Sequence, residues 1–361
     1  MYKIFTVLGT RPEIIKLSRI IKVFDNNFDH KIIHTGQNYD YELYQIFFNE
    51  LKIRKPDLFL NCAKSTAMET IAEIFLKFEK YINKNKPDAI FVLGDTNSAY
   101  ASLVAKKNNI PVFHFEAGNR CFDDKVPEEI NRKIVDHISD LNMTYTKLSK
   151  DNLIMEGLHP EKVIEIGSPM KEVLNYYKNK INNSKILKSL KLTKKRFFLI
   201  SLHREENVDD KKKLTHFLES INSLCKLYKI PGIISTHYRT AKNIEKMNIK
   251  KKYLRFNNPF GFFDYIKLQK NSFITLSDSG TLSEESSLLG KTAVHLRHCT
   301  ERPEGVENGA IILSGPNLKK LKNSVKIASK NKFVVNHPSY NKDNVSGVVL
   351  KSIISYLDYY R

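Results

Sequence analysis

Three acidic residues in the first half of the chain are placed where acid–base chemistry would use them. Asp95 lies in LGDTN, Glu116 in FEAGNR and Glu128 in PEEINR, and the first two directly follow apolar runs. Carboxylates that converge on one site repel one another, so at least one is expected to hold a proton near neutral pH. General acid–base catalysis uses such a mixture of protonated and ionised groups. Helix capping is the competing interpretation for Asp95, and an acidic first helical turn is the preferred one for Glu129.

A basic turn near the N-terminus is suited to a phosphate group. Residues 9–13 read GTRPE after an apolar run, and Thr10 and Glu13 have the spacing of a helix capping box. A glycine turn that opens a helix presents backbone N–H groups to an anion, and Arg11 and Lys16 add positive charge at the same end. The segment is neither a GxGxxG nor a Walker motif, and an ordinary strand–helix turn is the competing interpretation.

Two histidines in the second half also follow apolar runs. His203 lies beside Arg204 in SLHREEN, and His237 lies in STHYR. A single histidine more often has a structural role than a catalytic one, but a predicted strand end next to an arginine favours a site role for His203.

Residues 277–285, SDSGTLSEE, predict a cradle for a diphosphate. Ser279 and Gly280 precede a helix start, where backbone N–H groups and hydroxyls bind anions. Glu285, just inside that helix, is placed to accept hydrogen bonds from ribose hydroxyls, whereas simple capping by Ser279 is the competing interpretation. A further charged turn, TERPEG, contains Arg302.

The elements that position these motifs alternate between strands and helices. Short β-branched or apolar runs recur at residues 4–8, 31–35, 89–93, 111–115, 162–166, 196–202, 232–236, 272–277, 292–296 and 310–314. Such runs with intervening helices predict parallel sheets covered by helices on both faces. In these doubly wound α/β sheets, ligands bind at the carboxyl ends of the strands, where the motifs above are expected to lie.

The runs form two sets, which predicts two α/β domains facing a central cleft. The polar segment around residues 178–195 separates the sets and is interpreted as a linker, so that one domain covers 1–180 and the other 181–361. A length of 361 residues suits two domains of ordinary size. By analogy, the last helix, near residues 344–360, is expected to pack back on the first domain.

Composition argues against several other classes of protein. No apolar run reaches ~18 residues and the N-terminus lacks the layout of a signal peptide, so membrane insertion is not expected. The four cysteines show no CxxC or CxxH spacing, which gives no support for a zinc site or disulfides and favours a reducing cytoplasm. The net charge of +20 comes from lysines spread along the chain, so no nucleic-acid partner is predicted.

Eight motifs follow one another along the chain. They are GTRPE with Lys16, HTGQNYDYEL, LGDTNS, EAGNRCFDDKVPEEINRKI, IGSPM, HREEN, SDSGTLSEE and TERPEG. Together they resemble the non-hydrolysing UDP-N-acetylglucosamine 2-epimerases over nearly the whole chain. The resemblance implies a glycosyltransferase-B fold, with two Rossmann-like domains and the active site between them. It implies no nicotinamide, other cofactor or metal, and, as is common for such enzymes, a homodimer.

The resemblance also implies a mechanism. The C2 proton of the sugar is not next to a carbonyl, so the family eliminates UDP in an anti sense to a 2-acetamidoglucal and adds it back after protonation on the other face. The acid–base group by matched motif is Asp95, Glu116, Glu128 and His203, and which of them removes the C2 proton stays open. Support for the departing diphosphate comes from Arg11, Lys16 and His203. The remaining contacts to the UDP-sugar are assigned to Arg204, His237, Ser279, Gly280, Glu285 and Arg302.

Two departures from the family pattern leave the substrate open. Asn38 stands where relatives acting on UDP-N-acetylglucosamine usually carry histidine, in a segment that belongs to an allosteric site in some of them, so that regulation is not implied here. The usual EAGLRT reads EAGNRC, from Glu116 to Cys121. Both variants resemble a capsule and O-antigen subgroup that epimerises UDP-2-acetamido-2,6-dideoxy-L-talose to UDP-N-acetyl-L-fucosamine.

Two competing activities share the expected UDP site. A UDP-sugar glycosyltransferase would pass the sugar to an acceptor and has less need of three clustered carboxylates. A hydrolysing epimerase would release free UDP and free sugar, and the resemblance of the GTRPE opening to the non-hydrolysing enzymes disfavours it.

Overall fold

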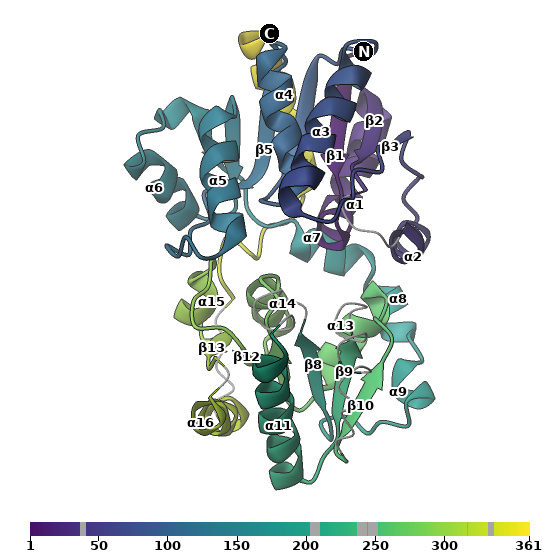
Figure 1. Cartoon of the computed structure of the whole chain (residues 1–361), viewed down its shortest axis with the longest axis vertical. Helices are drawn as coiled ribbons and strands as arrows, with labels where there is room; N and C mark the ends of the chain where they lie inside the picture. The colour runs from purple at the N-terminus through teal and green to yellow at the C-terminus, as the bar shows by residue number, and fades with distance from the viewer. Residues whose placement is uncertain (37–40, 203–209, 237–243, 245–251, 316, 331–335) are drawn as a thin grey trace. The chain divides into compact units, whose positions relative to one another are not determined.

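The chain folds into two α/β units, each built on its own parallel sheet (Figure 1). One unit comprises Met1–Asn175 and Pro338–Arg361, and the other comprises Tyr176–His337. The computed structural model describes residues 1–36, 41–202, 210–236, 244, 252–315, 317–330 and 336–361. The predicted class, parallel sheets covered by helices in two units, is confirmed.

Seven parallel strands form the sheet of the first unit, in the order β3-β2-β1-β4-β5-β6-β7. They are β1 Lys3–Leu8, β2 Asp29–His34, β3 Leu58–Phe59, β4 Ala89–Leu93, β5 Val112–Ala117, β6 Leu141–Thr144 and β7 Val163–Glu165. In this register Val7 pairs with Val92, and Val92 pairs with His114. The carboxyl ends of β1, β4 and β5 therefore lie side by side, and these are the ends that carry the acidic and basic motifs.

Helices cover both faces of this sheet. They are α1 Arg11–Asn27, α2 Tyr41–Leu51, α3 Ala67–Ile82, η1 Asn97–Tyr100, α4 Ala101–Lys107, α5 Pro127–Ile138, α6 Lys147–Met155, η2 Pro160–Lys162, α7 Met170–Tyr176 and α17 Val345–Tyr360. Side chains alternate across a strand, so Val92 and Val112 pack in the same core as α3, α4 and α5. Phe91 instead contacts Phe24 of α1, and Phe113 contacts Tyr360 of α17.

Six parallel strands form the sheet of the second unit, in the order β10-β9-β8-β11-β12-β13. They are β8 Phe198–Leu202, β9 Gly232–Thr236, β10 Leu254–Asn257, β11 Thr275–Ser277, β12 Ala293–His295 and β13 Ile311–Leu313. The helices are α8 Lys178–Asn183, α9 Ile186–Ser189, α11 Lys211–Tyr228, α13 Phe262–Asn271, α14 Leu282–Leu289, α15 Glu304–Glu307 and α16 Leu318–Lys330. The sequence does not predict β10, nor β3 and β6 of the first unit.

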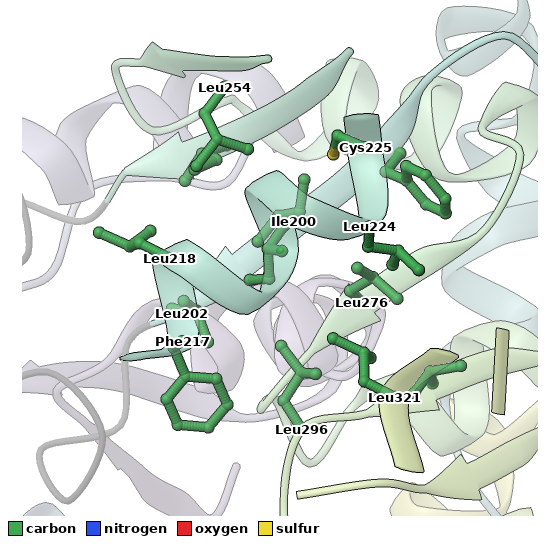
Figure 2. Packing of buried hydrophobic residues seen from close by; sticks show 14 of the residues in the cluster. Ile200, Leu202, Phe217, Leu218, Leu224, Cys225, Leu254, Leu276, Leu296 and Leu321 are labelled. Carbon is green, nitrogen blue, oxygen red and sulfur yellow. The ribbon is translucent and has the colours of Figure 1, made fainter. Parts of the chain in front are cut away.

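The core of the second unit lies between its sheet and two amphipathic helices. Figure 2 shows Ile200 of β8 and Leu276 of β11 beside Leu218 and Leu224 of α11, with Leu321 of α16 at the same cluster. The alternate residues of the strands pack on the opposite face of the sheet, against α13.

The predicted linker is wrong as a description of residues 178–195. This segment forms α8 and α9, and its apolar side chains Ile186, Leu187, Leu190 and Leu192 pack against the sheet of the second unit. The lysines between these apolar residues dominate the composition of the segment, so its apolar face was not recognised from the sequence. Among the described residues, no helix is long and apolar enough to cross a membrane.

Two leucines on α11 test the role of this core. Leu224 is fully buried, whereas Leu227 is 60% exposed on the same helix. We expect Leu224→Ala to lower the free energy of unfolding of this unit by about 2–5 kcal/mol, because it removes buried methyl groups and leaves a cavity. The matched control Leu227→Ala is expected to change it by about 0.5 kcal/mol or less. Amide hydrogen exchange of β8 measures both, and equal effects would contradict the packing described.

Candidate functional site

The turn between β1 and α1 is organised by a buried carboxyl group. Glu13 Oε2 accepts hydrogen bonds from the backbone N–H groups of Gly9 and Thr10, at 2.9 and 2.6 Å, and from the Thr10 hydroxyl. Its other oxygen accepts one from the Thr96 hydroxyl at 2.8 Å. Burial raises the pKa of Glu13 to about 7, although these hydrogen bonds oppose the shift. The capping box predicted from the sequence thus also ties the first motif to the residue that follows Asp95.

Lys16 and Glu116 form an ion pair out of contact with bulk water. The Lys16 ammonium donates to Glu116 Oε2 at 2.5 Å, and both side chains are less than a tenth exposed. The Tyr145 hydroxyl donates to the same oxygen at 3.0 Å, and the ammonium lies 5.5 Å from the centre of the Tyr145 ring. The pair joins α1 to the end of β5, across 100 residues of sequence. Arg11, at the start of α1, lies 5.6 Å from the ring of Phe47.

Asp95 is held by an arginine on α5. Arg132 Nε donates to Asp95 Oδ2 at 2.7 Å, and Arg132 also pairs with Glu129. Glu129 accepts from the backbone N–H groups of Cys121 and Phe122. Burial raises the pKa of Glu129, but the Cys121 N–H and the Arg132 charge lower it by more, so the net shift is downward. Glu129 does lie in the first turn of a helix, as predicted, but its carboxylate also holds the backbone of residues 121–122.

Two of the three carboxylates that were expected to repel one another each face a cation in the structure. Asp95 faces Arg132 and Glu116 faces Lys16, so each has a cation of its own. Glu128 lies half-buried in the first turn of α5. Burial raises the pKa of Glu13 to about 7, and the sequence motifs did not place this carboxyl group among the acid–base residues.

A Cβ atom at Gly280 would lie 2.1 Å from Glu301 Oε1 and 2.7 Å from an Arg302 nitrogen, so a larger residue here would have to displace the ends of these two side chains. Arg302 pairs with Glu284 at 3.2 Å. The Ser279 hydroxyl lies 3.0 Å from that of Thr281, and Glu285 is buried in the first turn of α14.

Each unit thus assembles its own part of the predicted residue set. The first pairs Lys16 with Glu116 and carries Asp95 directly after the adjacent strand β4, and the second packs Gly280 against Arg302. The remaining predicted site residues, His203, Arg204 and His237, and the variant position Asn38, lie outside the described residues.

Sequence reasoning missed the partners that hold the carboxylates. Tyr145 stands alone in its segment and offers no signal, but Arg132 follows Glu129 by three residues, the spacing at which helical side chains meet. Among the described residues, no group of three or more histidine, cysteine, aspartate or glutamate side chains is arranged to hold a metal ion.

Comparison with known proteins decides the family. The sequence profile of the UDP-N-acetylglucosamine 2-epimerases matches residues 23–354. The chain belongs to the UDP-N-acetylglucosamine 2-epimerase family. A solved structure of a member from Rickettsia bellii is 44% identical, with a TM-score of 0.91 and 99% of this chain and 98% of that chain covered. The family predicted from the motifs is confirmed, and so is the isomerase class of enzyme.

Two further family members bear on the ligand. The crystal structure of the Methanocaldococcus jannaschii UDP-GlcNAc 2-epimerase, in complex with UDP-GlcNAc and UDP, is 36% identical, covers 98% of this chain and 99% of that chain, and has a TM-score of 0.92. The UDP-2,3-diacetamido-2,3-dideoxy-D-glucuronate 2-epimerase of Pseudomonas aeruginosa is 35% identical, over 87% of this chain and 88% of its own.

The raised pKa of Glu13 predicts a pH-dependent contribution to the stability of this epimerase family member. A folded-state pKa of about 7, above the ordinary value for glutamate, means that the folded state binds more protons between about pH 4.5 and 7. The free energy of unfolding should therefore fall as pH rises through this window, by on the order of 3 kcal/mol, and level off above it. Glu13→Gln, which keeps the shape without the titration, should lack this dependence.

Urea titrations of the native protein and Glu13→Gln at half-unit steps from pH 5 to 8 measure the difference. Asp210→Asn, at the exposed start of α11, is the control for loss of a carboxylate. A difference between the native protein and Glu13→Gln that does not vary with pH would contradict the assignment.

Proposed function

We propose that this chain inverts C2 of UDP-N-acetylglucosamine without hydrolysis, by anti elimination of UDP to a 2-acetamidoglucal and re-addition. The observation that carries the proposal is the buried Lys16–Glu116 pair beside the GTRPE turn, in a chain that aligns with UDP-sugar 2-epimerases along nearly its whole length. The elimination of a diphosphate requires a base and a cation close together, and this pair lies at the carboxyl ends of the strands.

The first unit supplies the acid–base chemistry in this proposal. Asp95, Glu116 and Glu128, with His203 of the second unit, move the C2 proton and protonate the glycal on its other face. Lys16 and Tyr145 orient the Glu116 carboxyl group by donating to one of its oxygens. Arg11 and Lys16, with His203, offset the charge that develops on the departing diphosphate.

The second unit holds the nucleotide in this proposal. Ser279 and Gly280 bind the diphosphate at the start of α14 through their hydroxyl and backbone N–H groups. Glu285 accepts hydrogen bonds from ribose hydroxyls, and Arg302, with its carboxylate partners, lines the same segment. The remaining nucleotide contacts of the proposal are those of Arg204 and His237. The proposal includes a homodimer in the cytoplasm, which light scattering of the purified protein and cell fractionation test.

A second substrate is supported by the variant motifs. EAGNRC, around Asn119 and Cys121, resembles the subgroup that converts UDP-2-acetamido-2,6-dideoxy-L-talose for capsule and O-antigen synthesis. The Pseudomonas aeruginosa relative carries the name of another UDP-acetamido sugar epimerase, which supports some spread of substrates within the family. Family membership favours epimerisation over glycosyl transfer.

Proton NMR in deuterated water distinguishes these substrates. With UDP-N-acetylglucosamine alone we expect the C2 proton to exchange for deuterium while the C2 epimer appears, because the elimination removes that proton and solvent replaces it. The 6-deoxy L-sugar nucleotide is tested in parallel. Exchange of only the second compound would reassign the substrate, whereas free UDP and free sugar would indicate hydrolysis, and no exchange of either would refute epimerisation.

Glu116→Gln tests the acid–base role. Removal of a positioned acid or base costs about 100-fold to 10 000-fold in rate, so kcat should fall by this factor while UDP binding, measured by calorimetry, changes by about threefold or less. Glu165→Gln, on β7, which β6 separates from β5, is the matched control; Glu165 accepts a hydrogen bond from Ser339, and the variant should keep kcat within about twofold. A kcat near normal for Glu116→Gln would remove Glu116 from the mechanism.

A further inference from the structure

A fully buried histidine lies close to the loop that carries Asp95 and to the end of the strand that carries Glu116. His114 stands on β5, two residues before Glu116, and its ring is about 1% exposed. Its Nδ1 atom lies 3.0 Å from Asp136 Oδ1 and 3.3 Å from Asn142 Oδ1. Its Nε2 atom lies 2.8 Å from the backbone carbonyl oxygen of Gly94.

Both ring nitrogens therefore face hydrogen-bond acceptors. The carbonyl of Gly94 and the carboxylate of Asp136 cannot donate, and Asn142 is oriented with its amide nitrogen donating to the Asp136 backbone carbonyl, at 2.9 Å. A neutral imidazole has one N–H group and one lone pair, so in this setting its lone pair would point at an oxygen. Only the doubly protonated imidazolium satisfies both contacts.

The charges around the imidazolium balance. Asp136 is fully buried, and its second oxygen accepts from Arg120 at 2.7 Å. Arg120 in turn donates twice to Glu156, which follows α6, at 2.7 and 2.6 Å. Two cations and two carboxylates thus form one chain, which is the condition for keeping such groups out of water. Burial lowers the pKa of His114, but Asp136 and the carbonyl of Gly94 raise it by more, so the net shift is upward.

The same chain touches both catalytic loops. His114 holds the carbonyl of Gly94, the residue before Asp95, and Asp136 accepts from the backbone N–H of Gly118, two residues after Glu116. A Cβ atom at Gly118 would lie 2.1 Å from the Ser149 carbonyl oxygen, so the backbone here packs directly against α6 and leaves no space for a side chain.

We propose that the His114 imidazolium, paired with Asp136, is a positioning device that holds the Asp95 loop and the end of β5, which carries Glu116, in their working arrangement. The inference rests on the proposed function, because it concerns the spacing of those two carboxyl groups. His114 touches no substrate. Loss of the His114 side chain would let the segments that carry Asp95 and Glu116 shift. A displacement of ~1 Å at a reacting group costs about 100-fold in rate.

The sign of the pH effect follows from the direction of the shift. A histidine whose pKa is raised on folding contributes stability that is fully present below its unfolded pKa and is lost as pH rises through the folded pKa. Deprotonation above that value turns a lone pair toward Gly94 or Asp136, and kcat is expected to fall with it. The groups that face the ring are Asp136 on α5 and the neutral Asn142 on β6, with Arg120 and Glu156 next in the chain.

The protonation state is measured directly, without substrate. Long-range proton–nitrogen NMR correlations of a protein labelled with ¹⁵N at histidine distinguish an imidazolium from either neutral tautomer, and the His114 signal is assigned by its absence in His114→Gln. We expect the imidazolium pattern at pH 7.0. A neutral ring at this pH overturns the proposal. Asp136→Asn, which removes the facing charge, is a second variant and should convert the signal to the neutral pattern at pH 7.0.

Kinetics separate positioning from folding. His114→Gln should lower kcat by about 10-fold to 100-fold per UDP-binding site, with KM changed by about threefold or less. The matched control is His30→Gln. His30 is also buried and contacts a carboxylate, Asp25, at 2.7 Å, but it lies near the amino end of β2. It should keep kcat within about twofold even where its melting temperature falls.

Two results are decisive. Equal kcat values for His114→Gln and His30→Gln overturn the positioning role, because the loss would then be structural only. Absence of C2 exchange by the native protein refutes the proposed function instead. The protonation state of His114, which is measured without substrate, does not depend on that outcome.

Discussion

The structure of the first unit depends on one constraint: a charge removed from water needs an opposite charge or several donors close to it. Glu13, Glu116, Glu129 and Asp136 are all nearly inaccessible. Glu13 is met by backbone N–H groups and hydroxyls, and the other three each by a lysine, an arginine or a histidine. None of these groups can move without leaving a partner unsatisfied, so the network that allows the charges to be buried also fixes their positions.

This constraint explains why the site follows the sheet. Parallel pairing brings the ends of β1, β4 and β5 to one edge, but backbone pairing alone does not set side-chain spacing. Long side chains from the covering helices do so, with Lys16 reaching from α1 to β5 and Arg132 from α5 to the end of β4. The helices therefore act on the site as well as on the core, since each contributes the cation that its neighbouring carboxylate needs.

Local patterns predicted most strands, because a continuous apolar run is visible in sequence. Strand β6 escaped prediction because Asn142 interrupts its run, and Asn142 is polar because it bonds to His114 and Asp136 inside the core. The strand-end motifs also lie where they were predicted, at the carboxyl ends of β1, β4, β5 and β11. Their pairing could not be predicted, since Lys16 and Glu116 are 100 residues apart. The raised pKa of Glu13 could not be predicted either. The capping box is visible in the local sequence, whereas the burial that raises the pKa depends on the tertiary fold.

The position of Glu116 requires a defect in the strand. Along β5 the side chains alternate, with Phe115 packed near Phe91 and Tyr145, on the face covered by α1, and His114 bonded to α5 on the other. A regular strand would turn Glu116 toward α5 and away from Lys16. The register instead shifts between Phe115 and Ala117, and Glu116 takes a left-handed φ of +68°. Such a conformation costs about 1–3 kcal/mol and persists only where the surrounding structure fixes it. The bulge turns the Glu116 carboxyl group toward Lys16 of α1. The strained backbone at Glu116 is therefore a consequence of the ion pair that this side chain forms.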